Sequence, residues 1–428
     1  MKSEQHMNFT RFSGRHFPLN LLSLAMATLV IAAALPPRTL AQGSETVLYS
    51  FNGNDGSAPY AGLIADSHGN FYGTTYDGGD DGYGTAFELT PNGAAGWTQT
   101  ILYSFYVNGL HPDSGLIFDS AGNLFGTTFW GGTDLVGTAF ELMPQPDGSW
   151  RQRVIHTFVD DGSGRDGCYP DGNLISDSAG NLYGTTVSGG KHGGGTVFEL
   201  TPTTAGGWKE KILHGFNDTD NGIEGNYPAA GVIFDSAGNL YGTTAAGGTY
   251  GYGIVFELTP KPGGLWGEKI LYNFNNTNGD GFAPYSGLTI DPAGNLYGTT
   301  QLGGADGQGA VFELKPASGG RWIELLLHSF SAAELDGAQP VASPTLDAAG
   351  NLYGTTLLGG ANGVGTVFAL KPSAGANWTE TLLHSFGGGT DGFSPYAGLT
   401  LDAAGNLYGT TAGGGAYGYY GAVFEITP

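Results

Sequence analysis

The acidic residues best placed to bind a cation lie in one segment, Asn217-Asp218-Thr219-Asp220-Asn221-Gly222-Ile223-Glu224. Carboxylate and amide oxygens are the ligands that hard cations such as calcium prefer. The segment matches only part of a calcium-binding loop, because it lacks the full ligand spacing. We predict Asp218, Asp220 and Glu224 as the ligands if the protein binds calcium. The competing interpretation is that acidic loops keep the protein soluble.

Aromatic residues in the segments that vary along the chain are the candidates for ligand contact. Trp130 is the one Trp outside a position that recurs, and tyrosines are frequent in the same variable segments. Aromatic faces with hydrogen-bonding acids beside them suit sugars and protein partners. The sequence therefore predicts an acidic, aromatic rim that binds a glycan or a protein, with these contact residues: Trp130, Tyr60, Tyr169, Tyr227, Tyr285 and Tyr396.

Sequence signatures of the common catalytic chemistries are missing. No Cys/His zinc spacing, H-E-x-x-H, G-x-S-x-G or P-loop pattern occurs. His156, His214, His328 and His384 recur at one equivalent strand position, so we expect them not to converge on a single ion. Cys168 is the only cysteine, which excludes an intramolecular disulfide, and no base that would activate it can be identified. These patterns favour a protein that is not an enzyme.

Composition excludes several classes of protein. Of 428 residues, 78 are Gly and 21 are Pro, which argues against a helical bundle. Aromatic residues make up 12%, too many for a disordered acidic tail. The net charge of -23 should repel nucleic acid and anionic membranes.

The N-terminal 41 residues have the pattern of an export signal. Lys2, Arg11 and Arg15 precede an apolar run over residues 21–35, and Thr39-Leu40-Ala41 approximates a small-x-small cleavage site. The run is shorter than the roughly 20 residues that a membrane-spanning helix needs. We predict that residues 1–41 are a removed signal peptide and that the protein is secreted, periplasmic or attached to the cell surface. No membrane span is expected after its removal.

One phrase, Gly-Asn-Leu/Phe-Tyr/Phe-Gly-Thr-Thr, recurs seven times at spacings of 53 to 58 residues. Each unit contains four short segments of β-favouring residues separated by Gly, Asn, Asp or Pro. Seven units of four strands predict an all-β fold, a seven-bladed β-propeller with one blade per repeat. The phrase starts at Gly69, Gly122, Gly180, Gly238, Gly294, Gly350 and Gly405.

The two ends of the repeat region complement each other. Residues 47–51 match residues 101–105, the fourth segment of the first unit, and the seventh unit stops after its third segment at residues 422–428. The N-terminal strand is therefore predicted to complete the C-terminal blade and close the ring, which leaves no free sheet edge. An open solenoid would need capping units. We predict one domain over residues 42–428.

The units resemble the GloVer (Gloeobacter and Verrucomicrobia) repeat of exported bacterial proteins. The resemblance is carried by Ala-Gly-Leu-x-x-Asp-x-x-Gly-Asn-Leu-Tyr-Gly-Thr-Thr-x-x-Gly-Gly and Gly-Thr-Val-Phe-Glu-Leu-Thr-Pro, over residues 45–428. Members often carry a C-terminal sorting anchor, whereas this sequence ends at Pro428 with no apolar tail. The resemblance implies a repeat scaffold and no particular activity.

Residues that recur in nearly every unit are predicted to be structural. The Trp that opens each fourth segment, as in Trp97 and Trp150, is expected to pack between blades. The Glu of the Phe-Glu-Leu segment is expected to accept hydrogen bonds from neutral donors, because cations are scarce. The Asp-x-x-Gly-Asn segments are interpreted as tight turns and not as calcium loops.

Three functions remain compatible with these observations. The first is an exported, non-enzymatic scaffold that binds a glycan or an extracellular protein through the rim. The second is an extracellular calcium-dependent hydrolase or lyase acting on sugars or lactones, which rests on analogy between propellers. The third is a spacer with no small ligand.

Overall fold

The computed structural model describes residues 43–93, 96–160, 162–218, 223–331, 335–373, 377–387 and 389–428. The predicted signal peptide and the predicted calcium ligand Asp220 lie outside these residues. The described residues between 43 and 428 form one compact unit. Within the described part of the chain, no helix has the length and apolar character needed to cross a bilayer.

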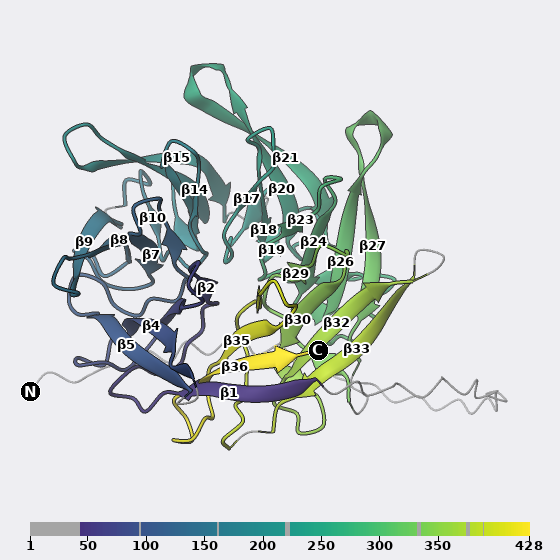
Figure 1. Cartoon of the computed structure of the whole chain (residues 1–428). Helices are drawn as coiled ribbons and strands as arrows, with labels where there is room; N and C mark the ends of the chain where they lie inside the picture. Colours follow the sequence, from purple (N-terminus) through teal and green to yellow (C-terminus); the bar gives the residue numbers. More distant parts are fainter. Residues whose placement is uncertain are drawn as a thin grey trace, which may run out of the picture. The chain divides into compact units, whose positions relative to one another are not determined.

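Seven blades of four antiparallel strands follow one another along the chain, and Figure 1 shows their order by colour. In blade 3 two further short strands extend the sheet to six. Blade 1 contains β2 (Ile64–Ala65), β3 (Phe71–Thr75), β4 (Thr85–Pro91) and β5 (Trp97–Ser104). Blade 2 contains β6 (Ile117–Phe118), β7 (Leu124–Thr128), β8 (Thr138–Pro144) and β9 (Trp150–Thr157). Blade 3 contains β11 (Ile175–Ser176), β12 (Leu182–Thr186), β14 (Gly193–Pro202) and β15 (Trp208–Asn217).

The remaining blades repeat this order. Blade 4 contains β17 (Ile233–Phe234), β18 (Leu240–Thr244), β20 (Ile254–Lys261) and β21 (Leu265–Asn273). Blade 5 contains β23 (Thr289–Ile290), β24 (Leu296–Thr300), β26 (Ala310–Pro316) and β27 (Trp322–Ser329). Blade 6 contains β29 (Thr345–Leu346), β30 (Leu352–Thr356), β32 (Thr366–Pro372) and β33 (Trp378–Ser385). Blade 7 contains β34 (Thr400–Leu401), β35 (Leu407–Thr411), β36 (Ala422–Thr427) and β1 (Ser44–Ser50).

Short pairings join the loops of one face. In each of blades 3 to 6, the segment that enters the blade pairs with the segment after Gly-Thr-Thr. Two 3-10 turns, η2 (Pro262–Gly264) and η3 (Ser318–Gly320), lie in outer hairpins. The four pairs are β10 (Gly167–Cys168) with β13 (Ser188–Gly189), β16 (Gly225–Asn226) with β19 (Ala246–Gly247), β22 (Gly281–Phe282) with β25 (Leu302–Gly303), and β28 (Gly337–Ala338) with β31 (Leu358–Gly359).

The chain termini close the last blade as predicted. β1 pairs antiparallel with β36, from Ser44 opposite Thr427 to Ser50 opposite Ala422, and the two strands lie side by side in Figure 1. The hydroxyl of Thr410 in blade 7 donates to the carbonyl of Ala61, which precedes blade 1, at 3.0 Å. The predicted seven-bladed ring is confirmed.

The hydrophobic core lies between neighbouring blades. Phe216, at the end of β15, meets Phe256 of blade 4 with ring centroids 5.1 Å apart, and the equivalent Phe pair recurs at the other junctions. Trp208 of blade 3 packs against Phe125 of blade 2 at 5.7 Å. The recurring tryptophans therefore pack between blades, as predicted.

Acids inside the blades have both neutral and charged partners. The prediction of neutral donors for the recurring Glu is therefore only partly right, because four of the six also pair with Lys or Arg: Glu141, Glu199, Glu257 and Glu313. In the turn at Asp66, one carboxylate oxygen accepts hydrogen bonds from the backbone amides of His68 and Asn70, which confirms the turn interpretation. The Tyr72 hydroxyl donates to Glu88 at 2.8 Å. The same Tyr-to-Glu bond occurs in blades 3, 4, 5 and 7.

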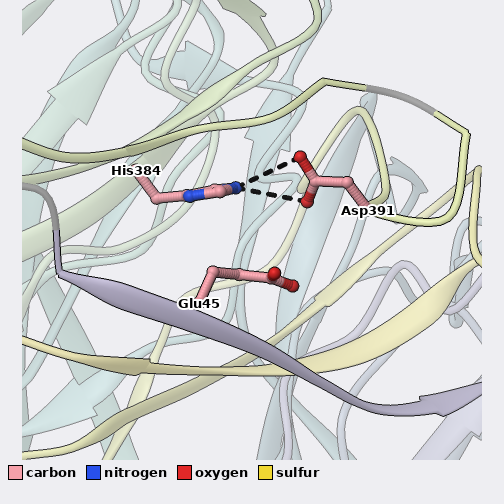
Figure 2. A group of neighbouring side chains, drawn as sticks. All are labelled: Glu45, His384 and Asp391. Atoms are coloured by element: carbon pink, nitrogen blue, oxygen red, sulfur yellow. Dashed lines mark hydrogen bonds and ion pairs between the residues drawn. The ribbon is translucent and has the colours of Figure 1, made fainter.

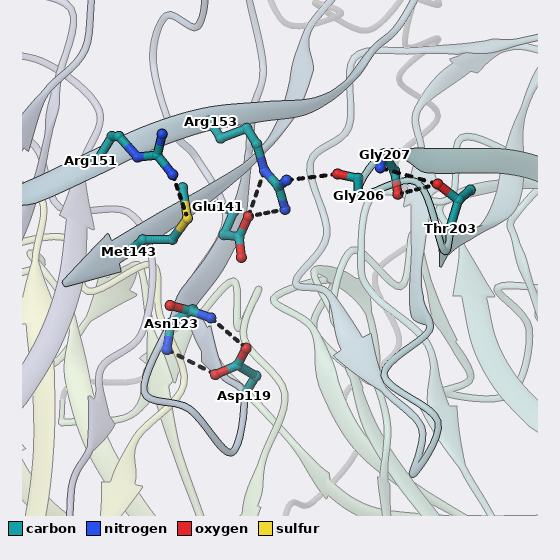
Figure 3. Close-up of polar contacts among 9 residues, drawn as sticks. All are labelled: Asp119, Asn123, Glu141, Met143, Arg151, Arg153, Thr203, Gly206 and Gly207. Atoms are coloured by element: carbon teal, nitrogen blue, oxygen red, sulfur yellow. Dashed lines mark hydrogen bonds and ion pairs between the residues drawn. The ribbon is translucent and has the colours of Figure 1, made fainter. Parts of the chain in front are cut away.

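Blade 2 replaces this tyrosine with Phe125, which has no hydroxyl, although Glu141 is still present and only 5% exposed. Arg153 supplies the missing donor, since its Nε donates to Glu141 at 2.8 Å. Its Nη1 also donates to the carbonyl of Gly206 in blade 3 at 2.9 Å (Figure 3). Arg153 therefore compensates for Phe125 and links two blades.

Replacing Arg153 by Ala is expected to lower the free energy of unfolding by about 2 kcal/mol, because it leaves a buried carboxylate without its charged donor. Lys211→Ala is the matched control: Glu199 in blade 3 keeps its bond from Tyr183, so we expect a loss of about 0.5 kcal/mol. Urea unfolding measures both. Phe125→Tyr should restore part of the loss in the Arg153→Ala background, and equal losses in the two single variants would contradict this account.

Candidate functional site

The rim loops hold the predicted tyrosines at two different positions. Every connection between blades contains an X-Pro step, and X has a positive φ of 52° to 60° in all seven. Tyr169 and Tyr227 occupy the residue before the proline, whereas Tyr60, Tyr285 and Tyr396 occupy the residue after it. A positive φ at non-Gly residues is uncommon. Its recurrence in each blade shows that it is part of the scaffold and fixes the direction of the loop.

Four predicted residues and one further tyrosine form a continuous series, which we call the aromatic arc. Tyr396 and Tyr60 have ring centroids 4.9 Å apart, and Tyr60 and Tyr76 are 5.3 Å apart. The Trp130 side chain hydrogen-bonds to Tyr76, with the indole N–H as the only available donor. Trp130 and Tyr169 follow at 5.0 Å. The arc thus joins loops of blades 7, 1, 2 and 3, and all five side chains are half-buried.

The other two predicted tyrosines lie outside the arc. Tyr227 is 40% exposed and Tyr285 is 44% exposed. Burial is the main cause of the raised pKa of Tyr227, and Tyr285 lies near enough to raise it further. They form a second, more open aromatic pair on the loops of blades 4 and 5.

Two carboxyl groups beside the arc were missed by the sequence analysis. Asp113 and Asp171 occupy the position after the loop proline that holds tyrosine in other blades, and their side chains hydrogen-bond to each other. Part of Asp171 stays exposed, yet the surrounding protein desolvates it enough to raise its pKa to about 6. Two hydrogen-bonded carboxyls share one proton, so this pair can both donate and accept a proton near neutral pH.

The charge of Asp113 also reaches the arc. Burial and the Asp113 carboxylate raise the pKa of the Tyr76 hydroxyl to about 12, so this tyrosine stays neutral. At the same point, the ring of His111 stacks on Tyr76 at 4.5 Å, and its Nδ1 lies 3.1 Å from Asp77. Half-buried rings and hydrogen-bonding acids therefore occur together on this part of the rim.

Several acids in the loops that lead into the blades, which we expected to make the rim acidic, are buried between blades. Asp166 is 8%, Asp280 9% and Asp336 1% exposed. Each lies directly before a glycine that packs against a threonine of the Gly-Thr-Thr strand; a Cβ on Gly281, for example, would lie 2.0 Å from Thr300. This close approach draws the preceding acid inward. The rim is consequently less acidic than expected.

The predicted calcium ligands are placed as follows. Asp218 is exposed and accepts a hydrogen bond from the Asn226 side chain at 2.9 Å. Glu224 is half-buried. The pKa of Glu268 is raised mainly by burial, and the charge of Glu224 raises it further. The third ligand is not described, so calcium binding at this segment stays a prediction.

Two other features have limited chemical capacity. The Cys168 thiol is buried, and burial together with nearby carboxylates raises its pKa to about 12, which leaves it protonated and unreactive.

A cavity of about 540 Å³ lies between blades 2 and 3 beside the Asp-x-x-Gly-Asn turns, and Arg153, Glu141 and Trp208 contribute to its lining. Arg153 already bonds to Glu141 and Gly206 there, as Figure 3 shows.

Fold and rim together define a closed seven-bladed β-propeller of tandem repeats that presents aromatic and carboxyl groups on its loops. The chain belongs to the Gloeobacter/Verrucomicrobia repeat family, whose model matches residues 38–233 and 227–428. No curated protein matches the sequence.

Solved structures with a similar fold include two bacterial proteins. One is a Bacteroides uniformis protein proposed to be a 6-phosphogluconolactonase, with a TM-score of 0.53 and 14% identity over 82% of this chain and 90% of the other. Another is a Thermus thermophilus protein proposed to be an oxidoreductase (glucose dehydrogenase), with a TM-score of 0.41 and 15% identity over 73% of this chain and 95% of the other. At 14% identity the similarity to the first of these describes the fold alone.

Asp171→Asn is expected to raise the melting temperature at pH 7.5. The native pKa of about 6 exceeds the ordinary value of 3.8, so the native state binds the proton more tightly and ionisation at higher pH destabilises the fold. The asparagine removes this penalty, on the order of 1 kcal/mol, and still donates to Asp113. The gain should shrink as pH falls from 6 towards 4, because the native carboxyl becomes protonated over this range, and it should vanish only below the ordinary pKa of 3.8, where Asp171 is protonated in both states. Thermal unfolding of both proteins between pH 4 and 8 measures it, and a gain independent of pH would contradict the assignment.

Proposed function

We propose that the protein is an exported scaffold that binds a glycan through the aromatic arc. The observation that carries the proposal is the continuous contact series Tyr396, Tyr60, Tyr76, Trp130 and Tyr169 with the Asp113–Asp171 pair beside it. Sugar rings combine apolar C–H faces with hydroxyl groups. Aromatic faces bind the former, and carboxylates accept hydrogen bonds from the latter.

Charge and compartment narrow the class of partner. The net charge of -23 disfavours polyanionic ligands, so neutral or amine-bearing glycans are the favoured class. The predicted signal peptide supports an address outside the cytoplasm, where such glycans occur. A protein partner is the alternative occupant of the same rim, since Tyr and Trp also dominate protein interfaces.

Tyr60→Ala and Trp130→Ala are expected to weaken glycan binding at least tenfold, because each removes one stacking surface from the arc. A glycan array identifies ligands of the wild-type protein, and calorimetry measures affinity. Ile323→Ala is the matched control: Ile323 is 53% exposed on β27, outside the rim loops, and its loss should leave affinity unchanged.

Folding must be checked in parallel. Trp130 packs on Tyr169 and bonds to Tyr76, so Trp130→Ala is expected to lower the melting temperature by a few degrees, whereas the fold should persist. Folded variants that bind every array ligand as tightly as the wild type would refute the arc as the binding site. An array without any ligand would refute glycan binding.

A second candidate function is hydrolysis of a sugar or lactone, and the carboxyl pair is the observation that favours it. In a hydrogen-bonded carboxyl pair the ionised member can activate water while the protonated member donates to the reacting oxygen. Such close spacing suits attack of water on a lactone carbonyl better than glycoside hydrolysis, whose two carboxyls lie about 5–9.5 Å apart. The raised pKa of Asp171 is suited to such a role. Calcium dependence is a separate part of this hypothesis and rests on Asp218, Asp220 and Glu224.

Asp113→Asn is expected to abolish turnover if the protein is a hydrolase, because asparagine cannot shuttle a proton. Under the binding hypothesis the same variant should change glycan affinity only a few-fold and no turnover should occur in either protein. A screen of lactones and glycosides, with and without a chelator, separates the two functions. Turnover that survives in the Asp113→Asn variant would remove the carboxyl pair as its source.

A further inference from the structure

At each junction between blades, three residue positions meet. The first position is the seventh residue of an outer strand, counted from its opening Trp position. The second is the acid or amide directly before the glycine that packs against the Gly-Thr-Thr strand. The third lies two residues after the opening Trp position of the next blade's outer strand. Histidine, a loop Asp and a Glu occupy them at three junctions: His156, Asp166 and Glu210; His328, Asp336 and Glu380; His384, Asp391 and Glu45.

At the junction of blades 2 and 3 the three side chains lie close enough to bind one ion, and two of them, His156 and Asp166, share a hydrogen bond without it. Nε2 of His156 lies 3.2 Å from Oδ2 of Asp166, and the three residues each offer a ligand atom within 4.8 Å of the others. Two ligands of a tetrahedral zinc ion lie about 3.3 Å apart, given metal–ligand distances near 2.0–2.1 Å. Backbone amides of Val159 and Gly167 hold the Asp166 carboxylate in place.

The glutamate completes the case for a ligand. Oε1 of Glu210 is buried and finds no hydrogen-bond partner among the described residues, and the same holds for Oε1 of Glu45. Buried carboxylate oxygens are costly to leave unsatisfied. Figure 2 shows the Glu45 carboxylate beside the His384–Asp391 contact. In that contact Nε2 of His384 lies 3.2 and 3.3 Å from the two Asp391 oxygens.

A fourth junction repeats the arrangement with a longer loop acid. Nε2 of His214 and Oε1 of Glu268 are both buried and lie 3.7 Å apart, and neither has a hydrogen-bond partner in the part of the chain that the structure describes. Glu224 is the acid of this loop.

The chain contains its own comparison. At the junction of blades 7 and 1, tyrosine and glutamine replace histidine and glutamate: Tyr49 donates to Asp55 at 2.6 Å, and Gln99 donates to the Asp55 carbonyl at 3.1 Å. The donors of Tyr and Gln complete that junction without another group. Of the three side chains at each histidine junction, two are carboxylates and only the imidazole can donate, and the backbone amides near the first junction are used by the loop Asp.

We propose that the junctions of His156, His328 and His384 each bind a divalent transition-metal ion of the zinc class through one imidazole nitrogen and two carboxylate oxygens. Imidazole disfavours calcium, which prefers oxygen ligands alone, and one nitrogen with two oxygens suits zinc with a water as fourth ligand. The ion bridges two blades and the loop between them, so it stabilises the ring. The sites are distinct from the aromatic arc and from the predicted calcium segment.

The test is titration of the chelator-treated protein with zinc, and with cobalt as a spectroscopic probe. His156→Tyr/Glu210→Gln converts one junction to the residue types found at the junction of Tyr49, Asp55 and Gln99, so it should fold. We expect it to lose one bound equivalent of zinc and part of the four-coordinate cobalt absorption, with the affinity of the other sites within about twofold. Zinc should also raise the melting temperature of the wild type more than that of the variant.

Glu324→Gln is the matched control, because it makes the same change at a junction with Tyr272 in place of histidine, and the zinc stoichiometry should stay constant. His384→Tyr/Glu45→Gln is an independent repeat if the first variant unfolds. An unchanged number of bound equivalents in either folded double variant overturns the proposal. Absence of saturable zinc binding, which would mean that a proton alone balances the carboxylates, overturns it as well.

Discussion

In every blade a phenylalanine ring lies over a glycine of the neighbouring strand, and the propeller is arranged around this contact. A Cβ on Gly242 would lie 2.5 Å from the ring of Phe256, its cross-strand partner. The ring then meets Phe216 of the preceding blade. The next residue, Thr243, donates its hydroxyl to the carbonyl of Ser286 at 2.7 Å, which ties blade 4 to the segment that enters blade 5. A single short strand thus fixes the sheet and both neighbouring blades.

The scarcity of cations sets the second level of organisation. With 15 Lys and Arg against 38 Asp and Glu, most buried acids must be balanced by neutral donors, by protons or by ions from outside. Inside the blades tyrosines fill this role, as Tyr72 does for Glu88, and Arg153 replaces the tyrosine that blade 2 lacks. Much of the small supply of cations is used here as well, because lysines pair with the glutamates of blades 3, 4 and 5. Between the blades burial raises the pKa of Glu268 and Glu324 to about 7, so these carboxyls become protonated readily. The inter-blade junctions are therefore where protons or ions affect stability most.

The fold was predictable because the same local sequence pattern recurs in all seven repeats. Asp66 and Asn70 specify their turn within five residues, and the unmatched strand at residues 47–51 reveals how the ring closes. The site was only partly predictable. Trp130 was found because it interrupts a pattern, but Asp113 and Asp171 meet across 58 positions of sequence, and no local pattern records their contact. The histidines lie at separate junctions, as expected, yet the glutamates that lie beside them from the next blade, such as Glu210 and Glu45, were not considered as their partners.

Rim and junction are linked through single loops. The segment between blades 2 and 3 carries Asp166 at the junction, Tyr169 in the arc and Asp171 in the carboxyl pair. Gly167 fixes this segment against Thr186, and only one residue separates Tyr169 from Asp171. With so short a span, the backbone cannot move at the junction without displacing the rim side chains. The partner of the Asp166 carboxylate, whether His156 alone or His156 with an ion, therefore also sets the position of the aromatic arc at its blade 3 end. The same few residues thus determine both the stability of the ring and the shape of the rim.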